Sequence, residues 1–239
     1  MYGLRKQIEA DVLSSHGDAT RYFVTFLDNH DVKERIRYVD PANPIRYDDQ
    51  VTLGVACLFS LPGIPCLYYG TEQGLHGVGS DPAVREALWG GPGFSQNTSY
   101  YQHIAQIAAI RRESPALRYG RFYFRPISGD GQNFGISPFL NGVLAFSRIL
   151  MDEVVLVVAN ADTNNACTVY VIVDITLNSA GTQLQISYTN KQQPQPPSAI
   201  QQLGAGTVKV LETDGTTGAG PVNCVQVRVA PLEVQILKR

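Results

Sequence analysis

The hydrophobic periodicity of the chain changes near residue 117, and this change restricts the fold more than any other feature of the sequence. Before it, helical patterns at 3–14, 49–60 and 99–113 alternate with short apolar segments at 22–27 and 64–69. Helices that alternate with short buried strands are typical of parallel β/α units. The apolar residues of segment 99–113 share one helical face, which we expect to pack against a sheet.

After residue 117, apolar and polar residues alternate with a period of two, which indicates β-strands. Turns rich in Gly, Asn, Asp and Pro separate the segments expected as strands, at 121–125, 143–149, 154–160, 167–173, 184–188, 207–212, 224–229 and 234–238. Many short strands joined by local turns favour an antiparallel sandwich. The expected fold is therefore an α/β part at 1–117 followed by an all-β antiparallel sandwich at 118–239.

No charged residue occurs between Val51 and Thr71, and an apolar segment of this length can span a bilayer. Pro62, Gly63 and Pro65 interrupt it, so we expect a buried helix, a tight turn and a short buried strand, and no membrane partner. The start of the chain lacks the continuous apolar stretch and small-residue cleavage site of a signal peptide.

Charge and cysteine content exclude several classes of function. Lys plus Arg number 19 against 21 Asp plus Glu, a net charge of -2. Such a chain lacks the basic surface that binds nucleic acid. The four cysteines, Cys57, Cys66, Cys167 and Cys224, form no CxxC pair, which argues against a zinc site or a disulfide scaffold.

A polar cluster, Asp28-Asn29-His30-Asp31, directly follows the apolar segment that ends at Leu27. In a parallel β/α barrel, the loops that follow the strands open into one active-site mouth, which would place His30 and Asp31 for chemistry. An ordinary polar turn with a helix cap explains the same residue types. On these residues alone, both interpretations stay open.

A second motif favours the chemical interpretation. The segment LPGIPCLYYGTEQG at 61–74 follows FLDNHD at 26–31 along the chain. The pair resembles the PGxPxxYYGxE and FxxNHD segments of the α-amylase family of glycoside hydrolases, and the following all-β region resembles that family's C-terminal domain. The resemblance implies a truncated β/α-barrel portion at 1–117, holding the last two β/α units, and a C-terminal β-sandwich domain at 118–239.

The resemblance also implies roles for individual residues. Asp31 corresponds to the aspartate that stabilises the oxocarbenium-like transition state, and His30 to a histidine that binds the sugar at the cleavage point. Asn29 and Tyr69 are further candidates for substrate binding. Glu72 matches a family glutamate whose expected role is structural.

Other residues carry weaker expectations. Asp28, Glu34 and Glu72 are the local carboxylates that can join Asp31 in catalysis. Tyr68, Tyr69 and Trp89 can stack on sugar faces, although aromatic residues in or beside strands more often fill cores.

Part of the family's catalytic machinery has no counterpart in this sequence. Retaining hydrolysis needs a nucleophile and an acid/base about 5 Å apart. The family carries them on a GxRxD segment and on a glutamate after the fifth strand, and no stretch of the chain matches either. A complete barrel takes about 250 residues, so the strands expected at 22–27 and 64–69 should have unpaired edges. Exposed edges and apolar faces recruit partners, and we expect a homo-oligomer.

Three functions follow from these observations. The first is a glycoside hydrolase of α-amylase type that acts on α-1,4-glucans such as starch and maltooligosaccharides. The second is a non-catalytic α-glucan-binding remnant, or a fragment of a longer amylase. The third is an isolated sandwich that serves as an interaction module, which the retained segment 26–31 disfavours. The residues identify no cofactor, and the resemblance alone allows calcium. The resemblance also implies that family members are often secreted, and the localisation of this chain stays open.

Overall fold

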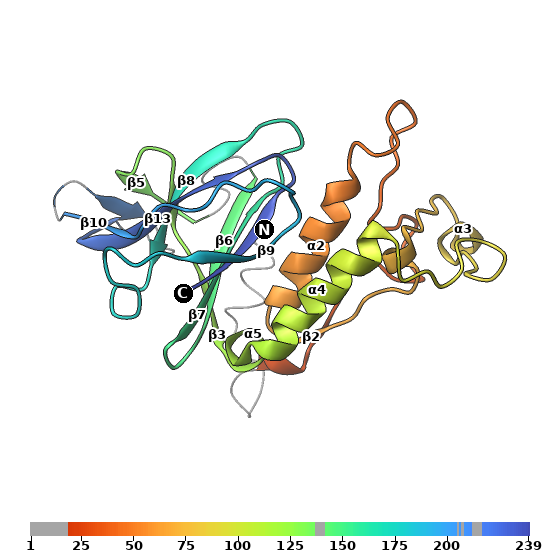
Figure 1. Cartoon of the computed structure of the whole chain (residues 1–239), viewed down its shortest axis with the longest axis horizontal. Coiled ribbons are helices and arrows are strands. Elements are labelled where there is room, and N and C mark those ends of the chain that lie inside the picture. Colours follow the sequence, from red (N-terminus) through yellow and green to blue (C-terminus); the bar gives the residue numbers. More distant parts are fainter. Residues whose placement is uncertain (1–18, 137–141, 205, 207, 212–216) are drawn as a thin grey trace. The chain divides into compact units, whose positions relative to one another are not determined.

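The computed structural model describes residues 19–136, 142–204, 206, 208–211 and 217–239. The chain forms two compact units, one ending at Ser114 and the other running from Pro115 to Arg239 (Figure 1). The helix expected at 3–14 lies outside the described residues. Among the described residues, no helix has the length and apolar character needed to cross a membrane.

The unit that ends at Ser114 is built around one pair of parallel strands and two long helices. Its elements are η2 (Ala19–Tyr22), β1 (Val24–Thr25), α2 (Asp48–Ser60), β2 (Ile64–Pro65), η3 (Thr71–Gln73), α3 (Asp81–Val84) and α4 (Ser99–Glu113). β1 pairs with β2 in parallel, with Val24 opposite Ile64. The parallel direction agrees with the sequence, but each strand has two residues instead of the expected six. No other described strand pairs with them, and the described residues form no closed barrel.

The segments of these strands are exposed, which corrects the expectation of buried strands. Phe23, Val24, Phe26 and Ile64 are each about half exposed, at 47%, 56%, 51% and 54%. Buried strands need layers on both faces, and the described residues of this unit leave about half of each of these side chains exposed.

Helices α2 and α4 begin and end almost where the sequence predicts. Thr98 caps α4, because its hydroxyl accepts a hydrogen bond from the N–H of Tyr101 at 3.0 Å. α4 packs against α2 and η3, not against a sheet as expected (Figure 1). Arg111 of α4 donates to the carbonyls of Phe59 and Gly63, at 2.6 and 2.8 Å, and so satisfies acceptors left open where α2 ends.

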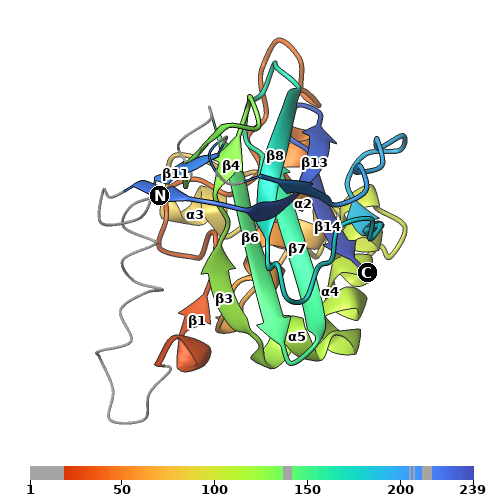
Figure 2. The same cartoon turned by 90° about the vertical axis from the view of Figure 1, so that its left-hand side faces the viewer.

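The two larger sheets of the unit from Pro115 to Arg239 are antiparallel, as predicted (Figure 2), whereas β5 (Asn133–Phe134) and β11 (Lys209–Leu211) of a small third sheet pair in parallel. It begins with α5 (Pro115–Tyr119). One sheet has the order β3 (Arg121–Phe124), β6 (Val143–Leu150), β7 (Glu153–Asn160), β14 (Val234–Lys238), β9 (Gln185–Thr189). A second has the order β10 (Gln201–Leu203), β13 (Val222–Val229), β8 (Cys167–Val173), β4 (Ile127–Ser128). A small third sheet joins β12 (Thr217–Ala219), β11 (Lys209–Leu211) and β5 (Asn133–Phe134).

An apolar core lies between the two larger sheets and confirms the period-two pattern. Alternate residues of β8 and β13, from Val169 to Val173 and from Val225 to Val229, are at most 5% exposed. They belong to one cluster with Val143 and Ala145 of β6 and Leu156 and Val158 of β7, so residues from both sheets share one core. Burial of alternate positions on facing sheets defines a sandwich.

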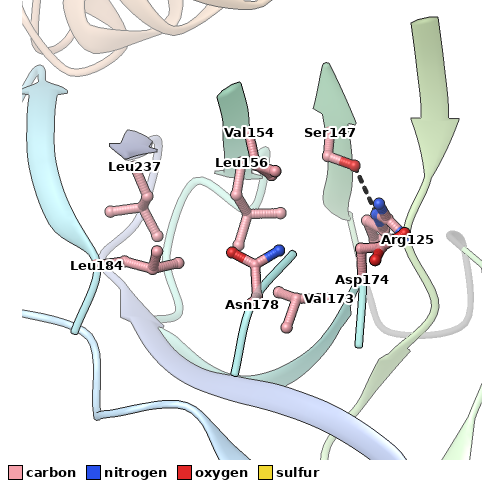
Figure 3. A pocket seen from close by; sticks show the side chains of 9 residues that line it. All are labelled: Arg125, Ser147, Val154, Leu156, Val173, Asp174, Asn178, Leu184 and Leu237. Atoms are coloured by element: carbon pink, nitrogen blue, oxygen red, sulfur yellow. Dashed lines mark hydrogen bonds between the residues drawn. The ribbon is translucent and has the colours of Figure 1, made fainter. Parts of the chain in front are cut away.

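One end of this core is polar (Figure 3). Arg125 donates a hydrogen bond to Ser147, and Asp174 lies beside it. Burial lowers the pKa of Arg125, whereas Asp174 opposes this effect. The surrounding pocket, closed by Leu156, Val173 and Leu237 among others, holds no space for a water molecule, so it is a packed seam and not a ligand site. All four cysteines are free.

Candidate functional site

Two side chains shape the loop that follows β1. Asn29 Oδ1 accepts hydrogen bonds from the N–H groups of Asp31 at 2.8 Å and Val32 at 3.2 Å, which forms an Asx turn. Asp28 is 4% exposed, and its Oδ2 accepts a hydrogen bond from the N–H of Ile36 at 2.9 Å. The carboxamide of Asn29 and the carboxylate of Asp28 therefore hold the loop in shape. His30 and Asp31, which lie between Asn29 and Val32, form its tip.

His30 and Asp31 stand side by side at this tip. Nε2 of His30 lies 3.3 Å from Oδ1 of Asp31, and the two side chains are 61% and 71% exposed. Arg85, the C-cap residue of α3, contacts both residues of the tip. Its Nε donates a hydrogen bond to the carbonyl of His30 at 3.2 Å, and its Nη2 lies 3.7 Å from Asp31 Oδ1. The same guanidinium is 3.6 Å from Asp81. An imidazole and a carboxylate are thus held together and open to solvent, where they can exchange hydrogen bonds with hydroxyl groups.

A buried arginine connects this loop to the segment after β2. The side chain of Arg35 is fully buried, and its Nε lies 2.8 Å from Oε2 of Glu86. Its Nη1 donates to the carbonyl of Tyr69 at 2.9 Å, and its guanidinium lies 4.4 Å from the ring centroid of Tyr68 and 5.2 Å from that of Tyr69. These contacts fix the loop after β1 against Tyr68 and Tyr69, so the tip has a firm base.

The remaining candidates, Tyr69 and Glu72, have different surroundings. The ring of Tyr69 is edge-on to that of Tyr68, with centroids 4.7 Å apart, and Tyr69 is 41% exposed. Glu72 lies in η3, where its carbonyl accepts a hydrogen bond from the Thr98 hydroxyl at 2.6 Å. Through this backbone contact Glu72 joins η3 to the start of α4. The structure therefore brings His30 and Asp31 into contact, whereas Asp28 points into the loop.

No sequence pattern singles out Arg35, Arg85 and Glu86, which hold the tip in place. The three residues lie in charged segments that read as solvent-exposed. Their partners are far away in sequence, and no local pattern distinguishes a buried arginine from a surface one. Among the described residues, no three His, Cys, Asp or Glu side chains gather closely enough to hold a metal ion.

The comparisons with known proteins agree with the motifs. No family model matches the chain. It is 33% identical over 164 residues to the cyclomaltodextrin glucanotransferase of Geobacillus stearothermophilus, a match that covers 69% of this chain and 20% of the relative. It is 29% identical over 212 residues to that of Bacillus sp. (strain 1-1), which covers 88% of this chain and 24% of the relative. The chain thus spans only about a fifth to a quarter of these relatives.

Solved structures show the same fold over almost the whole chain. The three-domain cyclomaltodextrin glucanotransferase CldA superimposes with a TM-score of 0.62 at 21% identity, covering 93% of this chain and 37% of that one. The α-amylase of Geobacillus thermoleovorans superimposes with a TM-score of 0.60 at 17% identity, covering 99% of this chain and 42% of that one. Taken with the sequence relatives, these matches show that the chain belongs to the α-amylase family of glycoside hydrolases and is consistent with the C-terminal part of its members.

Proposed function

We propose that the loop after β1 is part of an α-1,4-glucan site of α-amylase type, in which Asp31 stabilises the transition state of glycosidic bond cleavage. The observation that carries this proposal is the exposed His30–Asp31 pair, held by the Asn29 turn and by Arg85 at the carboxyl end of β1. Relatives named as cyclomaltodextrin glucanotransferases support a glucan substrate.

The chemistry fits this arrangement. Cleavage of a glycosidic bond develops positive charge on the sugar ring, and a fixed carboxylate beside the ring lowers that barrier. Asp31 supplies the carboxylate, and Arg85 restricts its position. His30, Asn29 and Tyr69 contact sugar hydroxyls or ring faces in this proposal. Glu72 and Asp28 remain the weaker candidates for catalysis. The carboxylate of Asp28 already accepts a hydrogen bond from the N–H of Ile36.

We also propose that residues 1–117 are two β/α units of an incomplete barrel and that 118–239 are a C-terminal domain. The parallel pairing of β1 with β2, and the helices α2 and α4 that follow them, support the first part. The exposed apolar side chains around β1 and β2 support association with further strands, supplied by another copy of the chain or by a longer protein.

The alternative is an α-glucan-binding remnant, or a fragment of a longer amylase, without activity of its own. It is favoured by the absence of any segment like the family's nucleophile or general-acid segment. It is also favoured by the small share of its relatives that the chain spans. Both candidates use the same loop and the same class of sugar, and they differ in turnover.

Replacement of Asp31 tests the catalytic proposal. Asp31→Asn keeps the shape of the side chain and removes its charge, so starch hydrolysis by rigorously purified protein should fall by at least about a hundredfold, or roughly 2.7 kcal/mol of barrier. His30→Ala should cost less, because it removes mainly hydrogen bonds to the substrate.

Asp28→Asn and Glu72→Gln test the two weaker candidates, because any local substitute for the missing nucleophile or acid must be a carboxylate. Hydrolysis that persists unchanged in Asp31→Asn would show that the activity arises elsewhere. Glucan binding without any hydrolysis by the unmutated chain would replace the enzyme by the binding remnant.

A further inference from the structure

Two exposed aromatic rings lie outside the site described above. Trp89 is 80% exposed and Phe94 is 58% exposed. The rings meet edge to face, with centroids 5.0 Å apart and planes at 76°. Aromatic rings bury large areas when they find a partner, and a contiguous exposed apolar patch marks a binding surface.

The segment that presents these rings is fixed by hydrogen bonds along its length. The N–H of Gly93 donates to the carbonyl of Leu88 at 3.0 Å. Gln73 and Gln102 donate side-chain N–H groups to the carbonyls of Ser95, at 2.8 Å, and Gln96, at 2.5 Å. The pair is therefore held before any ligand arrives, which lowers the entropy cost of binding.

The surroundings of the rings indicate what chemistry they bind. No charged residue occurs from Leu88 to Thr98, and the exposed Ser95, Gln96 and Asn97 offer hydroxyl and amide groups beside the rings. An ionic partner finds no counter-charge in this segment. A neutral polyhydroxyl ligand finds both an apolar face for its ring and hydrogen-bonding groups for its edge.

The pair also follows closely in sequence on Arg85, which contacts the His30–Asp31 loop. Trp89 follows Arg85 by four residues, and Arg85 contacts both the carbonyl of His30 and the carboxylate of Asp31. Four residues span at most about 14 Å, so the backbone of Trp89 lies within this distance of the backbone of Arg85. A ligand of several sugar units is longer than this.

We propose that Trp89 and Phe94 form a stacking platform that binds sugar rings of an α-1,4-glucan beyond the His30–Asp31 loop. The choice of an α-glucan rests on the proposed function. The platform contacts the ligand and takes no part in bond cleavage, so it sets affinity for longer chains.

The chain contains a single tryptophan, which makes the test direct. In a titration of the full chain with maltoheptaose, tryptophan emission should shift to shorter wavelength in a saturable way, because the ring leaves water when a sugar covers it. Glycerol at equal mass concentration is the control and should leave the emission unchanged. An emission that does not change with maltoheptaose contradicts the platform. An emission that changes only with protein concentration also contradicts it and indicates that the rings take part in self-association.

Variants then separate the platform from the loop. By calorimetry, Trp89→Ala should raise the Kd for maltoheptaose by about tenfold and Phe94→Ala by less, whereas Tyr119→Ala, which removes an aromatic side chain 53% exposed in the other unit, should leave it unchanged. Equal effects of Trp89→Ala and Tyr119→Ala contradict the proposal.

The two proposals can fail separately. The emission shift should survive in Asp31→Asn, because the platform lies outside the reacting centre. Hydrolysis that depends on Asp31 without any response of Trp89 refutes the platform alone. A full emission response in a chain whose turnover ignores Asp31 supports the platform and refutes the catalytic proposal.

Discussion

At the scale of single residues, the tip of the candidate site can be predicted from the sequence, whereas the contacts that hold the tip in place cannot. His30 and Asp31 stand in a motif, and both were predicted as a pair. Arg35 lies four residues further on and fixes the tip through Glu86 and Tyr69, at 2.8 and 2.9 Å. Sequence could not predict this role, because burial of Arg35 depends on side chains that are distant in the chain.

The buried position of Arg35 leads to a prediction for stability. Arg35→Met removes one partner of a buried pair and leaves the Glu86 carboxylate, itself 26% exposed, without its counter-charge. We expect the free energy of unfolding of this unit to fall by about 3 kcal/mol, the lower end for broken buried pairs, since Glu86 keeps some contact with water. Urea denaturation followed by far-ultraviolet circular dichroism, whose helical signal comes mainly from α2 and α4 of this unit, measures it.

Arg112→Met is the matched control. Arg112 pairs with Glu113 at 3.8 Å, and both side chains are more than 70% exposed, so its loss should change stability by well under about 1 kcal/mol. Similar destabilisation by the two variants would mean that the Arg35 pair contributes no more than a surface contact.

At the scale of elements, local signals predicted the ends of several helices and strands well. α4, β8 and β14 begin and end at the predicted residues, because a cap, a proline or a period-two run defines them. β1 and β2 came out shorter than predicted, since strand length depends on neighbours that the sequence of one strand does not show. The two- and three-residue strands β4, β5, β10 and β12 were missed for the same reason.

The turn between α2 and β2 yields a prediction at this scale. Gly63 has φ +98°, and a Cβ added there would lie 2.6 Å from the carbonyl oxygen of Phe23, the residue before β1. Gly63→Ala should therefore lower the stability of the unit by the cost of a left-handed alanine, about 1 to 2 kcal/mol, and by a further penalty of at least about 1 kcal/mol because β1 and β2 must separate.

Gly79→Ala isolates the first of these two effects. Gly79 has φ +99°, but a Cβ there would meet nothing within 4 Å. The difference between the two variants in urea midpoints measures the close approach of the turn to β1. Equal midpoints would show that this approach does not constrain the chain.

At the scale of the whole molecule, the two units differ in how completely they bury their apolar side chains. The sandwich encloses its core between two sheets, as its sequence predicts. The unit that ends at Ser114 leaves apolar side chains around β1 and β2 exposed. The short length of the β/α part predicted that these strands would lack neighbouring strands. It did not indicate which residues would pair with them. Self-association stays a prediction.

Amide NMR of the full chain, titrated with maltoheptaose, tests whether the loop after β1 binds α-1,4-glucan. We predict saturable chemical-shift changes at Asn29, His30 and Asp31 and at Arg85, which holds them, while core residues of the sandwich such as Val171 and Val227 stay unchanged. Asp31→Asn should weaken the response at the loop and keep the fold. An absence of shifts at Asn29–Asp31, or shifts confined to residues after Pro115, would contradict binding at this loop.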